Sequence, residues 1–513
     1  MMNAILGSRT NRREFICSAI AAAVAQDVPG VISAEGVPNA LQQRLATDPQ
    51  RPQIHFLPAA NWMNDPNGPI YWKGSYHLFY QYDPQGAYWG DMHWGHAISA
   101  DMVHWQHMPF ALAPTPGGPD AAGCFTGSAI VDGDRVVALY TGVVNDGSGK
   151  PNSFGESQCL AYSLDPRLIQ WTKLEKPVIA SPPPDLNTTG FRDPSAWKQG
   201  DWYYMTVGSG IPKVGGAVLL YRSKDLEHWT YMHVLAQGPW PQIPPAFAES
   251  GDMWECPEFF ALGGKHVLIY SAEAKVFWHC GKLDPETMRF RAEKHGVMDL
   301  GDYYAAKTQL DAEGRRVTWG WILEQRSEEK FRAAGWAGVM SLPRVLTLDL
   351  ENELRMTFAP ELQGLRQGAR HLQVTADKQV LRKRLAGMSL DQGCAEILGS
   401  LRANESFELS LVSDEPQMQA RLTFRYDAAN RSVHLDQKTF TLDQARETFE
   451  FRVYVDGSVL EILIDQEVAY TKRFYYAGSH APRMFVRLNG SPSSLLALTI
   501  WTLSPISSNR LTA

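Results

Sequence analysis

The pattern of apolar and polar positions along the chain changes character once, near residue 344. Before that point, five turn signals each lead into a short run of aromatic and β-branched residues, which is typical of a strand half buried in a sheet. These runs are Tyr76–Tyr80, Val136–Tyr140, Trp202–Thr206, His266–Tyr270 and Val317–Trp321. The turn glycines stand at positions 74, 133, 200, 264 and 314, a spacing that suits one four-stranded unit with its loops. We therefore predict a five-bladed β-propeller over residues 50–345.

Beyond a predicted linker at residues 346–367, polar and apolar residues alternate with a period of two. The alternating segments are Ser406–Leu411, Arg421–Tyr426, Phe449–Val455 and Val459–Ile464. Antiparallel strands with one face in water have this period, and Asp456-Gly457-Ser458 suits a hairpin turn between two of them. We predict an all-β chain that ends in a β-sandwich over residues 368–513, with a supporting or sugar-binding role.

Residues 1–35 differ from both domains. Arg12-Arg13 followed by a short apolar stretch resembles a twin-arginine export signal, and Ala23-Val24-Ala25 fits a signal peptidase site. The alternative is a disordered basic tail. The stretch is too short to span a membrane, and no other segment offers about 18 uninterrupted apolar residues. We expect export to the periplasm or the medium, and no membrane partner.

The composition narrows the function classes. The chain has 513 residues and a formal net charge of −7, and its Lys and Arg residues are scattered, so no basic stripe for nucleic acid is expected. Sixteen Trp and nineteen Tyr give weak support for sugar binding, because aromatic rings pack on the apolar faces of sugars.

Cysteine and histidine positions do not favour a metal or a thiol nucleophile. The six cysteines have no zinc or disulfide spacing, so an unbridged set is expected. Four histidines at positions 93, 96, 104 and 107 lack a Cys or Glu at a regular helical offset, and we interpret them as polar strand edges. Cys256 has no histidine at a suitable spacing and is interpreted as a packed neighbour of Glu255. We expect neither a metal nor an organic cofactor.

Three acidic clusters carry the candidate chemistry. They are Asn64-Asp65-Pro66-Asn67-Gly68, Arg192-Asp193-Pro194 and Glu255-Cys256-Pro257. The acids stand seven to nine residues before the turn glycine of their repeat, which places them on the first strand of a blade, nearest the propeller axis. Ordinary turn acids are the alternative, but matching offsets in three repeats favour convergence. Carboxyl groups that converge in one pocket are the catalytic groups with which most glycosidases cleave a glycosidic bond.

Six segments together resemble glycoside hydrolase family 32, which contains invertases, inulinases, levanases and fructan exohydrolases. The segments are Trp62–Gly68, Phe79–Tyr82, Phe125–Ala129, Phe191–Pro194, Trp254–Pro257 and Trp319–Trp321. They occur in the family's order between about His55 and Arg344. A similarity to the family's β-sandwich continues at Val455–Tyr475.

The resemblance implies a retaining attack on a β-fructofuranosyl bond. Asp65 matches the nucleophile, Glu255 the acid/base and Asp193 the transition-state stabiliser. The two carboxyl groups of a retaining pair lie about 5 to 5.5 Å apart. Glu255 is expected to have a raised pKa, because it is partly buried near the anionic Asp65.

The resemblance also implies a set of substrate-binding residues. Arg192 matches a fixed donor beside Asp193. Positions that line the family's fructose pocket are matched by Trp62, Asn64, Gln81, Trp89, Phe125 and Ser128. Their polar groups would bond hydroxyls, and their rings would stack on the sugar.

One departure from the family concerns the substrate. Members that cleave sucrose well often carry an acid three positions before a lysine, and here Ala272 stands at that offset from Lys275. This departure favours fructan ends as substrates over sucrose. Trp62 and Asn64-Asp65 resemble the hydrolases of the family and favour water as the acceptor.

The expected function is a β-fructosidase acting on sucrose, levan or inulin, with their ranking and the oligomeric state left open. The alternatives are a fructosyltransferase, an inverting arabinan-type hydrolase on the same propeller and a non-catalytic fructan-binding protein.

Overall fold

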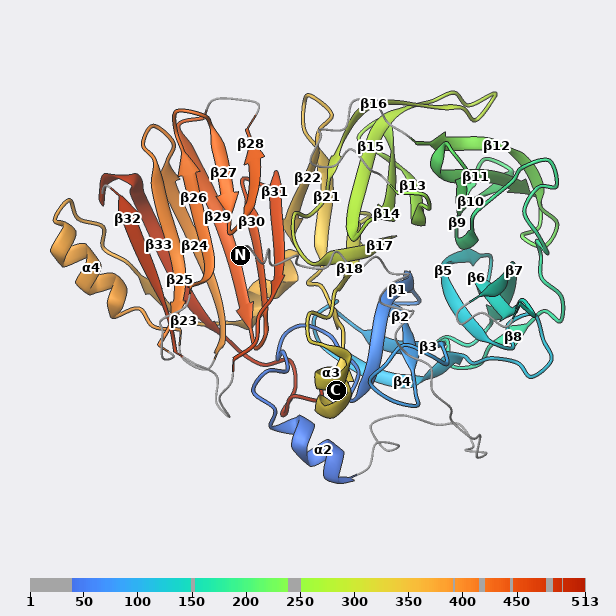
Figure 1. The fold of residues 1–513 in the computed structure, drawn as a ribbon, viewed down its shortest axis with the longest axis horizontal. Helices are drawn as coiled ribbons and strands as arrows, with labels where there is room; N and C mark the ends of the chain where they lie inside the picture. The colour runs from blue at the N-terminus through green and yellow to red at the C-terminus, as the bar shows by residue number, and fades with distance from the viewer. Residues whose placement is uncertain are drawn as a thin grey trace, which may run out of the picture.

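The computed structural model describes residues 39–148, 153–238, 251–390, 393–414, 420–442, 446–476, 483–490 and 492–512. In these residues the chain forms a ring of five sheets and, beside it, two sheets packed face to face (Figure 1). The all-β prediction of a five-bladed propeller followed by a β-sandwich is therefore confirmed. The predicted export segment at residues 1–35 lies outside the described residues.

The first three blades follow one another along the chain. Blade 1 contains β1 (Asn61–Trp72), β2 (Ser75–Asp83), β3 (His93–Ser99) and β4 (Trp105–Leu112). Blade 2 contains β5 (Gly123–Asp132), β6 (Arg135–Asn145), β7 (Phe154–Ser163) and β8 (Thr172–Lys173). Blade 3 contains β9 (Phe191–Gln199), β10 (Trp202–Ile211), β11 (Gly215–Ser223) and β12 (Thr230–Gln237). In each blade, neighbouring strands along the chain pair antiparallel.

Two further blades close the ring. Blade 4 contains β13 (Glu255–Leu262), β14 (Lys265–Ala272), β15 (Lys275–Leu283) and β16 (Phe290–Val297). Blade 5 contains β17 (Tyr303–Leu310), β18 (Arg316–Ile322), β21 (Arg344–Leu348) and β22 (Leu354–Phe358), with β20 (Val339–Met340) beside β18. The short β19 (Trp336–Ala337) pairs in parallel with β1 and so joins the end of the ring to its beginning. The five innermost strands β1, β5, β9, β13 and β17 contact one another around the centre (Figure 1).

Each innermost strand contains a β-bulge close to its N-terminal end. The antiparallel register breaks between Met63 and Pro66 in β1 and between Cys124 and Gly127 in β5. The same break occurs after Arg192 in β9, after Glu255 in β13 and after Tyr304 in β17. Proline, which cannot donate to a ladder, is tolerated at such bulges; Pro194 and Pro257 lie within two of them, and Pro66 directly follows a third. A bulge redirects side chains, so these positions can aim residues at the propeller axis.

The β-sandwich consists of a six-stranded and a five-stranded sheet. The first contains β23 (Arg366–His371), β33 (Leu495–Leu503), β24 (Cys394–Arg402), β29 (Thr448–Asp456), β30 (Val459–Ile464) and β31 (Val468–Arg473) in that order. The second contains β28 (Lys438–Thr441), β27 (Ser432–Leu435), β26 (Ala420–Asp427), β25 (Phe407–Ser413) and β32 (Met484–Gly490). Apolar side chains from both sheets form one core, as the four alternating segments of the sequence predict.

The structure places strands where the sequence predicts a linker. Residues 346–367 contain most of β21 and all of β22, which complete blade 5, and then η3 (Pro360–Leu365). The polar turn at Asp349–Glu353 interrupts the apolar pattern and hides the hairpin in the sequence. The passage between domains is therefore short, because β23 of the sandwich starts at Arg366.

Helices are few and short. The described residues contain α2 (Asn39–Ala46), α3 (Glu328–Ala334), α4 (Lys378–Ala386) and the 3₁₀ turn η5 (Pro492–Ser494) besides η3. No pattern in the sequence predicts α2, α3 or α4, since none of them is longer than nine residues. None of the helices in the described ranges has the length and apolar composition that crossing a membrane requires.

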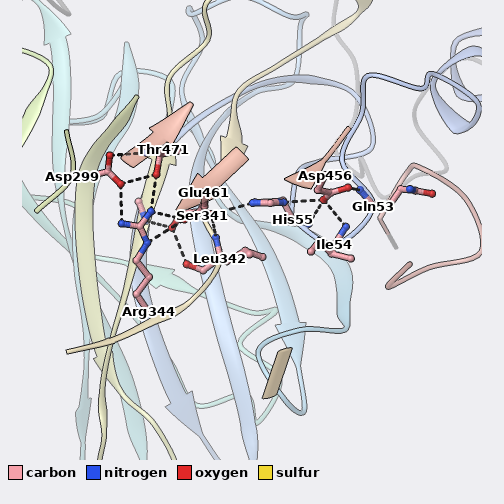
Figure 2. Close-up of polar contacts among 11 residues, drawn as sticks. Gln53, Ile54, His55, Asp299, Ser341, Leu342, Arg344, Asp456, Glu461 and Thr471 are labelled. Atoms are coloured by element: carbon pink, nitrogen blue, oxygen red, sulfur yellow. Dashed lines mark hydrogen bonds and ion pairs between the residues drawn. The ribbon is translucent and has the colours of Figure 1, made fainter. Parts of the chain in front are cut away.

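A buried network of charges joins the sandwich to the propeller (Figure 2). The β29–β30 hairpin supplies Asp456 and Glu461. Asp456 accepts hydrogen bonds from the backbone N–H groups of residues 53, 54 and 55. The His55 ring bridges the two acids, with Nδ1 2.8 Å from Asp456 Oδ2 and Nε2 3.0 Å from Glu461 Oε1. The sandwich hairpin thus fixes the segment that leads into β1.

Arg344 extends this network into blade 5. Its Nε and Nη2 atoms donate to Glu461, and Nη1 donates to Asp299 Oδ2 at 2.9 Å. Thr471 on β31 also bonds Asp299 through its backbone N–H and hydroxyl. The side chains of His55, Asp299, Arg344, Asp456 and Glu461 have no exposed surface. Breaking a buried pair by removing one partner costs about 3–5 kcal/mol, so this network holds the two domains in one arrangement.

The ionisation of the network follows from its contacts. Burial alone lowers the pKa of His55, but its bonds to Asp456 and Glu461 outweigh burial and raise the pKa from 6.5 to about 9. Burial alone raises the pKa values of Asp456 and Glu461. His55 and the backbone N–H groups of residues 53 and 54 outweigh it for Asp456, and Arg344 and His55 outweigh it for Glu461, so both pKa values are lowered. The imidazolium and the carboxylates therefore stabilise one another in the folded protein.

We expect His55 to make the stability of the protein fall at alkaline pH. A raised folded-state pKa gives a contribution of about 3 kcal/mol that is complete below about pH 6.5 and lost as the pH rises through about 9. The apparent melting temperature, measured from pH 6 to 10, should be lower for His55→Gln than for the wild type at pH 6.5. The difference should shrink by pH 9.5. His228→Gln removes an exposed His–Asp pair and should match the wild type throughout, whereas a His55→Gln difference that is constant with pH would contradict the charged imidazolium.

Candidate active site

The three acids predicted from the sequence lie together at the centre of the propeller. Asp65, Asp193 and Glu255 come from β1, β9 and β13, each at the bulge of its strand. Asp65 and Asp193 have no exposed surface, and Glu255 is 5% exposed. The backbone of Asp193 has φ 63°, a left-handed conformation that costs a residue with a side chain of order 1–3 kcal/mol. Such strain at a buried carboxylate is typical of a functional site.

Asp65 and Asp193 both contact the sulfur atom of Cys256. Its sulfur lies 3.5 Å from Asp65 Oδ2 and 3.5 Å from Asp193 Oδ2. Its backbone N–H donates to Asp193 Oδ2 at 2.9 Å. Cys256 also has a left-handed backbone, with φ 50°. This small residue between Asp65, Asp193 and Glu255 therefore fixes how the acids face one another.

Asp65 is held by neutral donors. Thr126 on β5 donates its hydroxyl to Asp65 Oδ2 at 2.6 Å, and the Asn64 amide donates to Oδ1 at 3.0 Å. The Trp62 indole in turn donates to Asn64 Oδ1 at 2.8 Å, which orients the amide. Hydrogen bonds to an ionised oxygen are stronger than neutral ones, so this chain of donors stabilises and orients a carboxylate that would otherwise be costly to bury.

Glu255 has different surroundings. Arg192 donates to Glu255 Oε1 from Nε at 3.1 Å and from Nη2 at 2.7 Å. Tyr304 on β17 donates its phenol to Oε2 at 2.6 Å. Arg192 also donates from Nη1 to Glu156 on β7 at 2.8 Å. Asp65 thus accepts hydrogen bonds from neutral groups, whereas Glu255 lies beside a cation.

The predicted substrate-binding residues lie around these acids in two groups. Trp62, Trp89, Phe125 and Cys256 belong to one buried cluster with Tyr304 and Trp321. Within it, Trp89 meets Phe125 edge to face at 5.6 Å and lies 6.3 Å from Phe154. This aromatic cluster gives the site apolar surface of the kind that packs on sugar rings.

The predicted polar residues bond mainly to the scaffold. The Gln81 amide on β2 donates to the carbonyl of Cys124 at 2.9 Å, at the bulge of β5. The Ser128 hydroxyl accepts a hydrogen bond from the backbone N–H of Ala196 at 3.2 Å and so joins blades 2 and 3. Asn64 and Arg192 contact the carboxylates directly, as described above. Ser128 thus joins the innermost strands β5 and β9, and Gln81 joins β2 of blade 1 to the bulge of β5.

Sequence reasoning misses Thr126, Tyr304 and Glu156. The first two had a signal, since counting back seven residues from Gly133 and ten from Gly314 reaches Thr126 and Tyr304. That offset is close to those of the three acids, so every blade supplies one polar group to the centre. Glu156 had no signal, because it lies on the third strand of its blade and its partner is distant in sequence.

The histidines at positions 93, 96, 104 and 107 have separate partners. His96 bonds His77, His104 bonds Asp101, and His107 bonds the carbonyl of Leu511. Among the described residues, no group of three or more His, Cys, Asp or Glu side chains is placed to hold a metal ion. The five cysteines in the described part of the chain are buried and unbridged.

The lysine that follows Ala272 bonds to the backbone. Lys275 Nζ donates to the carbonyls of Leu300 and Gly301 at 2.9 and 2.6 Å. Burial lowers its pKa from 10.5 to about 8, against smaller raising effects of nearby acids. Ala272 itself is buried in the core between blades 3 and 4. Both carbonyls lie between β16 and β17, so these hydrogen bonds of Lys275 do not involve Asp65, Asp193 or Glu255.

Two family models match the chain in succession. The model of the glycosyl hydrolases family 32 N-terminal domain matches residues 55–359, and the glycosyl hydrolases family 32 C-terminal model matches residues 361–502. The two matches therefore cover the propeller and the sandwich, and they meet within a few residues of the start of β23 at Arg366.

Similar proteins agree with these matches. A sucrose-6-phosphate hydrolase of Escherichia coli is 34% identical over 455 residues, which cover 83% of this chain and 89% of that protein. The structure of a Bombyx mori family 32 beta-fructofuranosidase has a TM-score of 0.73 at 30% identity, covering 91% of this chain and 97% of that one. A mutant of it has been solved in complex with sucrose.

A third relative is a fructan 1-exohydrolase of Cichorium intybus. Its structure has a TM-score of 0.75 at 26% identity, covering 89% of this chain and 98% of that one. A variant of that enzyme has been solved in complex with 1-kestose. Together with the family matches over both domains, these similarities show that the chain is a glycoside hydrolase and belongs to glycosyl hydrolases family 32.

Proposed function

We propose that this protein is a β-fructosidase that hydrolyses sucrose and the non-reducing ends of β-fructans with retention of configuration. The observation that carries the proposal is the convergence of three buried carboxylates, Asp65, Asp193 and Glu255, around Cys256 at the centre of the propeller. A retaining glycosidase needs one carboxylate that stays ionised as nucleophile and another that carries a proton.

The first step forms a fructosyl-enzyme. An Asp65 oxygen attacks the anomeric carbon as the bond to the leaving oxygen breaks, and Glu255 gives its proton to that oxygen. Asp193 accepts hydrogen bonds from fructose hydroxyls, which strengthen as the ring gains oxocarbenium character. The hydrogen bonds from Thr126 and Asn64 to the Asp65 oxygens weaken as the negative charge of Asp65 is lost in the new bond.

The second step reverses the roles. Glu255, now ionised and bonded to Arg192 and Tyr304, takes a proton from water. The oxygen of that water attacks the anomeric carbon and displaces the Asp65 carboxylate. The aromatic cluster around Trp62 and Trp89 surrounds the acids with apolar surface, and such a low-polarity environment strengthens electrostatic contacts with the reacting atoms.

The choice of substrate rests on the relatives and on Ala272. The relatives are named for sucrose 6-phosphate, for β-fructofuranosides and for fructan. Lys275 is bonded to backbone carbonyls, and Ala272 offers no carboxylate. This chain therefore has no acid at the offset associated with efficient sucrose cleavage, which supports activity on fructan ends beside sucrose.

Asp65→Asn and Glu255→Gln test the assignment of the acids. Both variants keep the shape of the side chain, so we expect folding to be unchanged and fructose release to fall at least about a thousandfold, or roughly 4 kcal/mol of transition-state stabilisation. The assay compares sucrose, sucrose 6-phosphate, levan and inulin. A folded wild type that retains fructan without releasing fructose would instead support a binding protein.

Methanolysis tests the retaining mechanism. Methanol competes with water for the fructosyl-enzyme, and the methyl fructoside keeps its configuration in solution. We expect methyl β-fructofuranoside, identified by NMR, because two inversions at the anomeric carbon restore the β configuration. The α product would contradict the retaining mechanism and favour an inverting, arabinan-type arrangement. Transfer to sugar at the same rate as to water would favour a fructosyltransferase.

We also propose that residues 1–35 direct export, on the basis of Arg12-Arg13 and the apolar stretch that follows. The mature protein is then expected to begin after Ala25 and to be found outside the cytoplasm. N-terminal sequencing of the protein from its native host checks this, and a mature chain that begins at Met1 or Met2 contradicts it. Replacing Arg12 and Arg13 by lysine should retain the precursor inside the cell.

A further inference from the structure

We propose that Glu156 is a positioning residue that shares the charge of Arg192 with Glu255, and so leaves Glu255 able to hold the proton it gives to the leaving group. This inference rests on the proposed role of Glu255 as the general acid. Glu156 lies outside the six family-like segments of the sequence, on the third strand of blade 2.

The contacts of Arg192 form a bridge between two carboxylates. Its Nε and Nη2 atoms face Glu255 Oε1, while Nη1 faces Glu156 Oε1 at 2.8 Å. The Glu156 side chain is 15% exposed and that of Arg192 is 14% exposed, so water screens the bridge only partly. Glu156 and Glu255 thus lie on different edges of one planar cation.

Glu156 also fixes the backbone that carries Arg192. Its Oε2 atom accepts the backbone N–H of Phe191 at 2.6 Å, at the first residue of β9. Glu156 pairs with Val143 across β6 and β7, so its own position is set by the blade 2 ladder. One carboxylate from blade 2 therefore determines where the guanidinium from blade 3 meets Glu255 of blade 4.

A general acid with these neighbours faces a conflict. Arg192 on Oε1 and Tyr304 on Oε2 both favour the ionised form of Glu255, because opposite charge and donated hydrogen bonds stabilise a carboxylate. In the first catalytic step, however, Glu255 must be protonated. The negative charge of Glu156 on the far edge of Arg192 offsets the arginine charge and shifts the balance back toward the protonated form.

Other charged groups around Glu255 stay the same when Glu156 is changed. Asp65 from β1 and Asp193 from β9 reach Cys256, the next residue along β13. Tyr304 and Lys307 come from β17, and the Lys307 ammonium is paired with Glu258 at 3.2 Å. A change in pH dependence on replacing Glu156 therefore reports the loss of this one charge.

Glu156→Gln tests the proposal through the pH profile of kcat/KM for the best substrate, measured from pH 4 to 9. Without the Glu156 charge, the alkaline limb, where the general acid loses its proton, should move to lower pH by at least about half a unit. The acidic limb should stay in place. Glu156→Asp keeps the charge one methylene further from Arg192 and should give a smaller shift in the same direction.

A matched control is Glu293→Gln. Glu293 also pairs with more than one cation on blade 4, namely Lys265 on β14 at 2.6 Å, Arg291 on β16 at 2.9 Å and Lys282 on β15 at 3.9 Å. Its pH profile should equal that of the wild type. A Glu156→Gln enzyme whose rate falls equally at every pH, with the alkaline limb unmoved, would show a merely structural role and overturn the proposal.

The two proposals fail in different ways. An inactive wild type contradicts the proposed function itself, whereas an active wild type with an unmoved limb in Glu156→Gln contradicts only this inference. If Glu156→Gln does not fold, the pH profile of Glu156→Asp tests the proposal instead. An alkaline limb of Glu156→Asp at the same pH as that of the wild type then overturns it.

Discussion

The β-bulge near the start of each innermost strand is the constraint on which the site depends. In a regular strand, consecutive side chains point to opposite faces, so neighbours such as Asn64 and Asp65 could not share one site. The bulges remove that limit, and Glu255 and Cys256 both reach the cluster of acids for the same reason. Left-handed backbone at Asp193 and Cys256 adds strain, which the paired strands of each blade outweigh.

Burial then makes the donors around each acid as important as the acids themselves. A buried carboxylate without partners is costly, because the lost hydration is not replaced. Blade 2 supplies Thr126 to Asp65, blade 3 supplies Arg192 to Glu255, and blade 5 supplies Tyr304. Each acid is therefore stabilised by a blade other than its own, and the site is complete only when the ring is closed through β19 and β1.

The parts that the sequence predicts well are those with local signals. Turn glycines and aromatic runs mark all five blades, and proline beside an acid marks three of the bulges. The linker prediction differs from the structure because a polar turn splits β21 from β22. His55 and Arg344 gave no signal, and Asp456 gave only that of a turn, since the partners of these residues are distant in sequence, 401 residues apart for His55 and Asp456. Contacts of that range are set by tertiary packing, which no local pattern records.

Two arginines show how the same chemistry serves stability and function. Arg344 bridges Asp299 and Glu461 with no exposed surface, and both acids belong to a network that also contains His55. Burial alone lowers the pKa of Arg344, but Glu461 and Asp299 outweigh it and raise the pKa, so Arg344 keeps its charge across the pH range in which the fold persists. Arg192 bridges Glu156 and Glu255 at a site that keeps some contact with water. At that site Glu255 can gain and lose a proton. Because the charge of Arg192 is shared between two carboxylates, it can adjust how readily Glu255 holds the proton without fixing Glu255 in its ionised form.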